Sequence, residues 1–310
     1  MLKLYRTDDT KVNELEEFMP ECWIDLCAPT KAELDSVVKM TGVDADFLRA
    51  SLDEEERSRI ETEDGQTLIL VDTPVIETGE SGHEYITIPF GIVLMPNCII
   101  TVCLKEAPIT KDFYTGRVRG FSTKKCNRFI LQLLYRNAAR FLYHLRIIDK
   151  RSTELETELH KSMKNKELIG MLGLEKSLVY FSTSLKGNEA VLERLLRMSF
   201  IRKYPDDTDL LEDVIIENKQ AIEMCTIYRD ILSGTMDAFA SVISNNLNIV
   251  MKILTLITII MTIPTIVASL WGMNVMVPFA ANPFGFWIVL GFAVVLAAGV
   301  AVFMKAKKMF

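Results

Sequence analysis

Five hydroxyl side chains recur at regular intervals in an apolar stretch near the C-terminal end of the sequence. Residues 253–274 are almost wholly apolar, and the polar side chains before the last three residues are Thr255, Thr258, Thr262, Thr265 and Ser269. Intervals of 3, 4, 3 and 4 residues place all five on one narrow face of a helix. Such side chains can bond to carbonyl oxygens of their own helix or hold two helices together. We favour a stripe that faces water or ions, because all five share one face.

The same interval continues towards the N-terminus, ahead of the apolar stretch. It passes through polar residues or glycine with one apolar exception: Asp230, Gly234, Asp237, Ser241, Ser244, Asn248 and Met251. One helix cannot enclose a pore. If the stripe lines one, several copies of the chain must surround a common axis.

Two apolar runs are long enough to cross a bilayer, residues 253–274 and 284–304. The loop between them, residues 275–283, has no charged residue. Lysines lie before the first run and after the second: Lys252, Lys305, Lys307 and Lys308. Positive flanks mark the cytoplasmic side, so we expect a multi-pass protein of the cell membrane with both termini in the cytoplasm. The first residues have no apolar segment of a signal peptide.

Charge and composition exclude several functions. The chain carries −6 overall, and the four lysines are the only charges after Ile249, which leaves −10 on residues 1–248. An acidic domain of this kind does not favour nucleic acid. It is compatible with a sensor of divalent cations, and the alternative is charge that serves solubility alone. The six cysteines form no CxxC pair and the three histidines are scattered, so neither set predicts a zinc site. No nucleophile–base pair or phosphate-binding loop indicates an enzyme.

The N-terminal part reads as mixed α/β. Thr30 and Glu33 form a capping box for a helix to about Met40, and Asp44 caps a shorter helix through Ala50. Strands are expected at residues 22–26, 67–71, 85–94 and 98–104. Helices are expected at 124–167 and 175–203, with a break at Gly170 and Gly173.

A third helix is expected to run to residue 274, with Thr208 or Asp209 as its N-cap. Its first half carries an apolar seam at intervals of 3 and 4, which predicts packing in a bundle. The seam skips Asn218 and Arg229 and contains Leu211, Ile215, Ile222, Cys225, Leu232, Met236, Phe239 and Ile243.

The fold class is therefore an α+β cytoplasmic domain, a small sheet with helices, followed by very long helices and a C-terminal two-helix transmembrane hairpin. The expected parts are an α/β domain (1–121), a bundle of long helices (122–208), a stalk (209–248), a first transmembrane helix (249–274), an external loop (275–283), a second transmembrane helix (284–304) and a basic tail (305–310).

Gly272-Met273-Asn274, at the end of the first apolar run, resembles the signature of the CorA family of magnesium and cobalt transport proteins. Its surroundings strengthen the resemblance, because Trp271 precedes it, Pro264 lies in the span behind it, and a second span with a lysine-rich end follows. Further similar segments are residues 23–26 followed by 29–30, residues 228–231 and residues 248–255.

The resemblance implies a homopentameric, funnel-shaped channel for divalent cations, with Mg²⁺ both transported and regulatory and no organic cofactor. Gly272, Met273 and Asn274 would form the selectivity filter, with Asn274 contributing a ring of amide oxygens. Mg²⁺ dehydrates reluctantly and prefers oxygen, so neutral oxygens that hold its hydration shell suit it.

The resemblance also implies roles along the long helix. Met251, with Leu254 nearby, would form an apolar gate just below Asn248. The alternative is that Met251 packs against lipid or a neighbouring helix, but its place on the polar stripe favours the gate. Asp237 and Asp230 would line the cytoplasmic mouth, or could be solvated helix charges.

A regulatory Mg²⁺ site is implied at Asp213, paired across a subunit boundary with an acid of the α/β domain. The candidates for that acid are Glu61, Glu63 and Asp64. Bound Mg²⁺ would hold the ring closed, and its loss would let the acids repel one another and the pore open. Plain surface charge is the alternative.

One feature departs from the family pattern, because the outer loop carries no acid. Co²⁺ and Ni²⁺ therefore remain candidate ions beside Mg²⁺. Two alternatives stay open, a zinc transporter of the same fold and a membrane-tethered scaffold that transports nothing.

Overall fold

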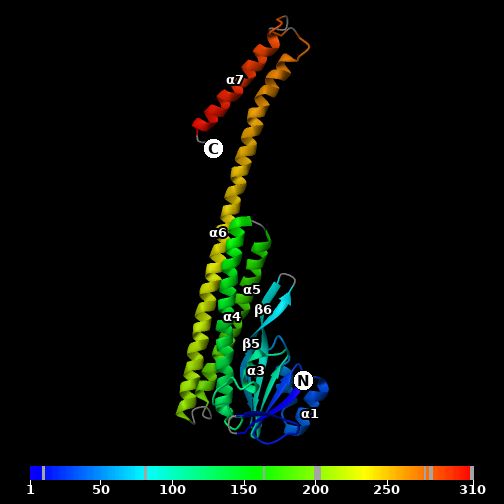
Figure 1. Ribbon diagram of the computed structural model, residues 1–310, viewed down its shortest axis with the longest axis vertical. Helices are drawn as coiled ribbons and strands as arrows, with labels where there is room; N and C mark the ends of the chain where they lie inside the picture. Colours follow the sequence, from blue (N-terminus) through cyan, green and yellow to red (C-terminus); the bar gives the residue numbers. More distant parts are fainter. Residues whose placement is uncertain are drawn as a thin grey trace. The chain divides into compact units, whose positions relative to one another are not determined.

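The computed structural model describes residues 1–8, 11–79, 82–162, 165–198, 204–275, 277–278 and 282–307 (Figure 1). It divides into two compact units, Met1–Met236 and Asp237–Phe310, and the long helix α6 (Pro205–Trp271) contributes to both. Lys203, Lys308 and part of the loop 275–283 lie outside the described residues.

The first unit contains one seven-stranded sheet with the strand order β2-β1-β3-β7-β6-β5-β4. Strands β3 and β7 are parallel, and the other neighbours are antiparallel. The strands are β1 (Leu2–Asp8), β2 (Lys11–Leu15), β3 (Cys22–Cys27), β4 (Arg59–Glu63), β5 (Gln66–Gly79), β6 (Gly82–Leu94) and β7 (Cys98–Cys103).

Alternate side chains of each strand point to opposite faces of the sheet. A separate apolar core covers each face. Leu68 and Leu70 pack in one core with Phe47 and Leu48 of α2, whereas Ile69 joins the other core. The first core lies under α1 (Lys31–Thr41) and α2 (Ala45–Ala50). The second core packs against α3 (Pro108–Tyr114) and the long helices α4, α5 and α6, on the opposite side from α1 (Figure 1).

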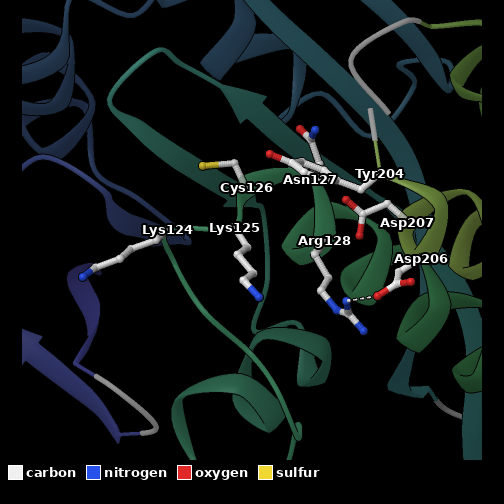
Figure 2. Close-up of a pocket in the computed structure, with 8 residues that line it drawn as sticks. All are labelled: Lys124, Lys125, Cys126, Asn127, Arg128, Tyr204, Asp206 and Asp207. Carbon is white, nitrogen blue, oxygen red and sulfur yellow. Dashed lines mark ion pairs between the residues drawn. The ribbon is translucent and has the colours of Figure 1, made fainter. Parts of the chain in front are cut away.

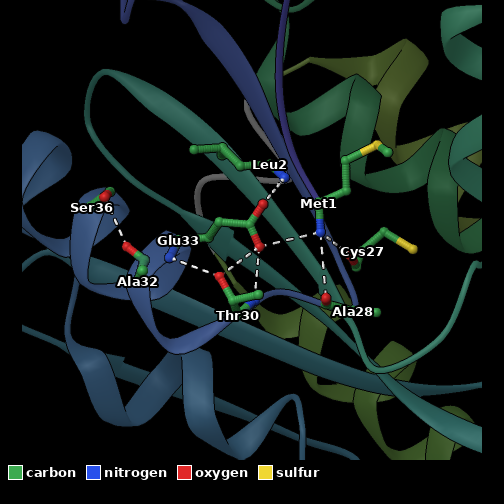
Figure 3. A network of polar contacts seen from close by, with 8 residues as sticks. All are labelled: Met1, Leu2, Cys27, Ala28, Thr30, Ala32, Glu33 and Ser36. Atoms are coloured by element: carbon green, nitrogen blue, oxygen red, sulfur yellow. Dashed lines mark hydrogen bonds and ion pairs between the residues drawn. The ribbon is translucent and has the colours of Figure 1, made fainter.

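The capping box predicted for α1 is confirmed, and it also anchors β1 (Figure 3). Thr30 Oγ1 accepts a hydrogen bond from the Glu33 backbone N–H, and the Glu33 carboxylate accepts one from the Thr30 backbone N–H at 2.7 Å. The same carboxylate accepts from the Leu2 N–H at 2.9 Å and lies 3.3 Å from the Met1 ammonium. These hydrogen bonds, with that from Thr30 the strongest, hold the pKa of Glu33 below its ordinary value.

The long helices are α4 (Cys126–Ser162), α5 (Asn165–Arg197) and α6 (Pro205–Trp271). The break predicted at Gly170 and Gly173 is wrong, because both glycines lie inside α5. Gly170 instead allows a close approach of helices, since a Cβ there would lie 3.1 Å from Leu155 Cδ1 of α4. Glycine marked a packing contact here and not a chain break.

The N-cap predicted at Thr208 or Asp209 is also wrong, because α6 begins at Pro205. Proline suits the first turn of a helix, where its missing N–H costs no hydrogen bond. Asp206 and Asp207 follow it in the first turn, where the helix dipole stabilises negative charge.

The predicted apolar seam of α6 is partly confirmed in the first unit. Leu211, Cys225 and Leu232 are buried, but Ile215 and Ile222 are half-buried. The buried positions between Leu211 and Cys225 are Val214, Asn218 and Ala221. The seam therefore runs through Asn218, a polar residue that the apolar pattern skipped.

The second unit contains the apolar part of α6 and helix α7 (Gly285–Ala306). Both helices are long and apolar enough to cross a membrane, and no residue of the most apolar 18-residue stretch of α6 is buried.

Candidate ion pathway

The threonines of the stripe all make the same local contact. Thr255, Thr258, Thr262 and Thr265 each donate the hydroxyl proton to the carbonyl oxygen four residues earlier, at 2.7 to 2.9 Å. The donor of each hydroxyl is therefore used within α6, and the oxygen keeps lone pairs as acceptors. The threonines thus bond to carbonyl oxygens of their own helix and at the same time form a polar stripe. Along the threonines, the stripe offers acceptors and no free donors.

The stripe and its neighbours are exposed in the isolated chain. All residues from Ser241 to Val250 are exposed, as are Met251 and Leu254, whose exposed fractions are 52% and 57%. Asn248 and Ser269 are exposed as well. The residues predicted to line a pore are therefore accessible on the surface of α6.

The tripeptide lies beyond the end of α6, not inside the helix as predicted. The helix ends at Trp271, and Gly272, Met273 and Asn274 form an exposed turn. The Gly272 N–H donates to the Ala268 carbonyl at 2.9 Å, and a Cβ on Gly272 would lie 3.2 Å from that oxygen. Helical bonding thus ends at Gly272 itself, and the close carbonyl favours a residue without a side chain there.

Sequence reasoning missed a contact that closes the loop after the tripeptide. The indole N–H of Trp271 donates to the carbonyl oxygen of Pro278 at 3.1 Å. The sequence pattern did not indicate this hydrogen bond, because the bond joins the end of a helix to an irregular segment.

The predicted acids of the cytoplasmic mouth lie seven residues apart on α6, which is about two helical turns. Asp230 is ion-paired with Arg229 at 3.2 Å. Asp237 is exposed, and its backbone carbonyl accepts a hydrogen bond from Ser241 at 3.0 Å. Asp237 therefore keeps its carboxylate accessible, whereas the Asp230 carboxylate has a partner.

The acids of the predicted regulatory site are exposed or half-buried. Glu61 is ion-paired with Arg59 at 3.1 Å, and Glu63 and Asp64 lie at the tight turn between β4 and β5, where Asp64 has φ +47°. Asp213 is exposed on α6. In the described part of the chain, no three His, Cys, Asp or Glu side chains are grouped to hold a metal. A site at Asp213 that needs a second subunit stays a prediction.

A polar cavity of about 450 Å³ lies where α4 and α6 begin (Figure 2). Arg128 of α4 and Asp206 of α6 face each other across it at 3.8 Å. Burial raises the pKa of the neighbouring Asp207 above its ordinary value. The ion pair joins the first turns of two long helices, and we assign this cavity a structural role.

An α+β domain joined to two helices long and apolar enough to cross a membrane, one of them with a polar stripe, is the architecture expected of an integral membrane transporter. The family model of the CorA-like Mg²⁺ transporter protein matches residues 21–306, and the chain belongs to this family. The family is one of transporters, and Mg²⁺ is its transported ion.

Two curated relatives carry the name cobalt/magnesium transport protein CorA. The protein of Methanocaldococcus jannaschii is 31% identical over 288 residues, which cover 88% of this chain and 86% of the relative. That of Thermotoga maritima is 24% identical over 310 residues, covering 97% and 87%.

Solved structures agree on the fold. The complete structure of the CorA magnesium transporter from M. jannaschii superposes with a TM-score of 0.84 and 26% identity, over 99% of this chain and 98% of that one. Full-length CmaX superposes with a TM-score of 0.73 at 15% identity, over 98% and 97%, which shows the fold alone.

Proposed function

We propose that the chain forms a channel for divalent cations that carries Mg²⁺ into the cell, with α6 of each copy lining the pore. The observation that carries this proposal is the row of four threonine hydroxyls that donate hydrogen bonds to carbonyl oxygens of their own helix. The water molecules around Mg²⁺ point their hydrogens outward, so a hydrated ion needs acceptors on the wall. The threonines of α6 present acceptors of this kind.

The charge of the stripe suits passage more than tight binding. No carboxylate lies in α6 beyond Asp237. Neutral oxygens bind a divalent ion weakly enough for release, whereas carboxylates within the span would retain it. An inside-negative potential supplies the driving force, about 2.3 kcal/mol per charge per 100 mV.

The outer end would select the ion. Asn274, with Gly272 and Met273, would form the filter, as a ring of amide oxygens around the axis of a homopentamer. Met251 and Leu254, which follow Asn248 along α6, would form an apolar gate that closes by dewetting. Asp237 would concentrate cations at the cytoplasmic mouth.

Intracellular Mg²⁺ would regulate the channel through Asp213 and an acid of a neighbouring copy, Glu61, Glu63 or Asp64. The ion would bridge carboxylates that otherwise repel, and so stabilise the closed ring. Co²⁺ is a second candidate ion, because the relatives are named cobalt/magnesium transport proteins. Both termini would lie in the cytoplasm, on the side of Lys252 and Lys305.

The test is ion flux into proteoliposomes that hold the full chain, measured for Mg²⁺, Co²⁺, Ni²⁺ and Zn²⁺, with and without internal Mg²⁺. We expect Mg²⁺ influx that internal Mg²⁺ suppresses and that Asn274→Ala abolishes. The control is Asn13→Ala, which removes an exposed asparagine of strand β2.

Other outcomes identify the alternatives. Retained Mg²⁺ influx in the Asn274→Ala protein contradicts the filter. Zn²⁺ influx without Mg²⁺ influx indicates the zinc transporter, and no influx of any ion indicates the scaffold.

A further inference from the structure

The tripeptide at the end of α6 has little local structure of its own. Gly272, Met273 and Asn274 lie in a turn and a bend after the last helical residue. In the described part of the chain, no side-chain hydrogen bond is found at Met273 or Asn274. The position of an Asn274 amide therefore depends on the segments that flank it.

Trp271 connects those two flanks. Its backbone ends the helix before the tripeptide, and its indole N–H donates to the Pro278 carbonyl after it, at 3.1 Å. A donor–acceptor distance of this length is that of an ordinary hydrogen bond. The bond closes a loop from Trp271 to Pro278, and the tripeptide lies inside this loop.

Trp271 is half-buried and also borders a hollow in the second unit. It lines an apolar niche of about 250 Å³ with Val267, Leu270, Val277, Pro278, Val289 and Phe292. Side chains of α6, of α7 and of the loop meet there. An indole suits this place, because its body is apolar and its single N–H needs one acceptor.

We propose that Trp271 is a positioning residue for ion selection, and that its indole N–H holds the loop so that Asn274 faces the ion path. The inference rests on the proposed function, since it assigns a support to the proposed filter. Trp271 itself does not contact the ion. Its effect passes through the Pro278 carbonyl and the closed loop.

The experiment compares Trp271→Phe, which removes the N–H and keeps an aromatic ring, with the wild-type chain in proteoliposomes. The matched control is Trp287→Phe, because Trp287 is an exposed tryptophan of α7 with a side-chain exposure of 66%. Mg²⁺ influx is measured over a range of concentrations, and Co²⁺ influx is measured beside it.

Loss of one neutral hydrogen bond should raise the half-saturating Mg²⁺ concentration about fivefold. We expect the ratio of Co²⁺ to Mg²⁺ influx to change in Trp271→Phe, with the thermal stability of the protein close to that of Trp287→Phe. A merely structural role would lower the maximal influx of both ions together and leave their ratio unchanged.

Two results overturn the inference. The first is a Trp271→Phe protein whose half-saturating concentration and ion ratio equal those of the Trp287→Phe control. The second is independent of transport. Subtracting the ultraviolet resonance Raman spectrum of Trp271→Phe or Trp271→Tyr from that of the wild-type chain isolates the signal of Trp271. We expect this signal to be that of a hydrogen-bonded indole. A signal of a free indole N–H contradicts the proposal. A wild-type chain that carries no Mg²⁺ but shows the bonded indole contradicts the proposed function instead.

Discussion

Asn218 of α6 donates its side-chain amide to the backbone carbonyl oxygen of Leu185 in α5, at 3.1 Å, in the middle of an otherwise apolar seam. Seven residues further along α6, Cys225 donates its thiol to the carbonyl of Leu178, seven residues back along α5, at 3.2 Å. The two contacts are one heptad apart on both helices, which run antiparallel. A single polar contact defines a register more strictly than apolar packing, since a shift of either helix leaves a buried donor unpaired.

Replacement of Asn218 by alanine should destabilise the chain. The side chain is 2% exposed, so the variant loses a buried hydrogen bond and leaves a small cavity. We expect a loss of about 1 to 2 kcal/mol of unfolding free energy. Thermal unfolding of the full chain in detergent measures it, with the exposed neighbour Lys219→Ala as control. Equal melting temperatures for both variants would show that the seam does not need this contact.

Replacement by alanine should change the stability of the chain in opposite directions at two glycines, Gly91 and Gly173. A Cβ at Gly91 would lie 1.8 Å from Ser51 Oγ and 2.6 Å from Ser51 Cβ, at the point where β6 meets the end of α2. We expect Gly91→Ala to cost about 3 kcal/mol, because Ser51 cannot move aside without a backbone shift.

Gly173 is the matched case, since it is exposed inside α5 and has no atom within 4 Å of an added Cβ. Gly173→Ala should stabilise the chain by about 0.5 to 1 kcal/mol. Denaturant unfolding of both variants provides the comparison. Rescue of Gly91→Ala by Ser51→Gly would confirm the clash as the cause, and a Gly91→Ala protein as stable as wild type would refute it.

Asp25 should make stability depend on pH. Burial raises its pKa from 3.8 to about 6, although its carboxylate accepts a hydrogen bond from Thr101 at 2.7 Å. The folded state therefore holds a proton more tightly than the unfolded state. The contribution of this carboxyl is fully present below about pH 4 and is lost as the pH rises through about 6, at most about 3 kcal/mol.

The measurement is the melting temperature between pH 4 and 8 for wild type and Asp25→Asn. The variant should show a smaller decline over this range, because an amide does not ionise. Asp35→Asn, on an exposed face of α1, serves as control and should follow wild type. A decline of the same size in the Asp25→Asn protein would assign the pH dependence to other groups.

Thr258→Val should reduce Mg²⁺ influx by about fivefold or more, since it removes one acceptor from each copy while keeping the shape of the side chain. Thr183→Val provides a matched control on α5, because Thr183 is exposed and also donates to the carbonyl four residues earlier, at 3.0 Å. Both variants lose the same local bond, but Thr183 lies outside the stripe. If both reduce flux equally, the acceptor stripe is not the cause.

Much of the fold was predictable where local chemistry decides the structure. The capping box of Thr30 and Glu33 begins α1, Asp44 caps α2, and the two apolar runs correspond to the membrane-length helices. Strands β3, β5, β6 and β7 were predicted because apolar, β-branched residues fill them.

The missed elements lack such a signal. Strands β2 and β4 lie at the two edges of the sheet, and each has at most one buried residue, so they carry few apolar residues. Strand β1 and helix α3 were missed as well. At Gly170 the prediction was wrong because tertiary packing against Leu155, and not local flexibility, explains the glycine. The regulatory acids could not be assigned, since the contacts proposed for them lie between chains.

The backbone-bonded threonines have a consequence for the energy balance of a cell. A proton crosses a pore by hopping along water and hydroxyl groups, each of which must both accept and donate. A hydroxyl that donates its proton in a hydrogen bond to a helix carbonyl can accept a further hydrogen bond, but it has no second proton to donate. A wall of this kind would add no step of its own to such a relay, so any leak of the proton gradient through the proposed channel would depend on its water alone.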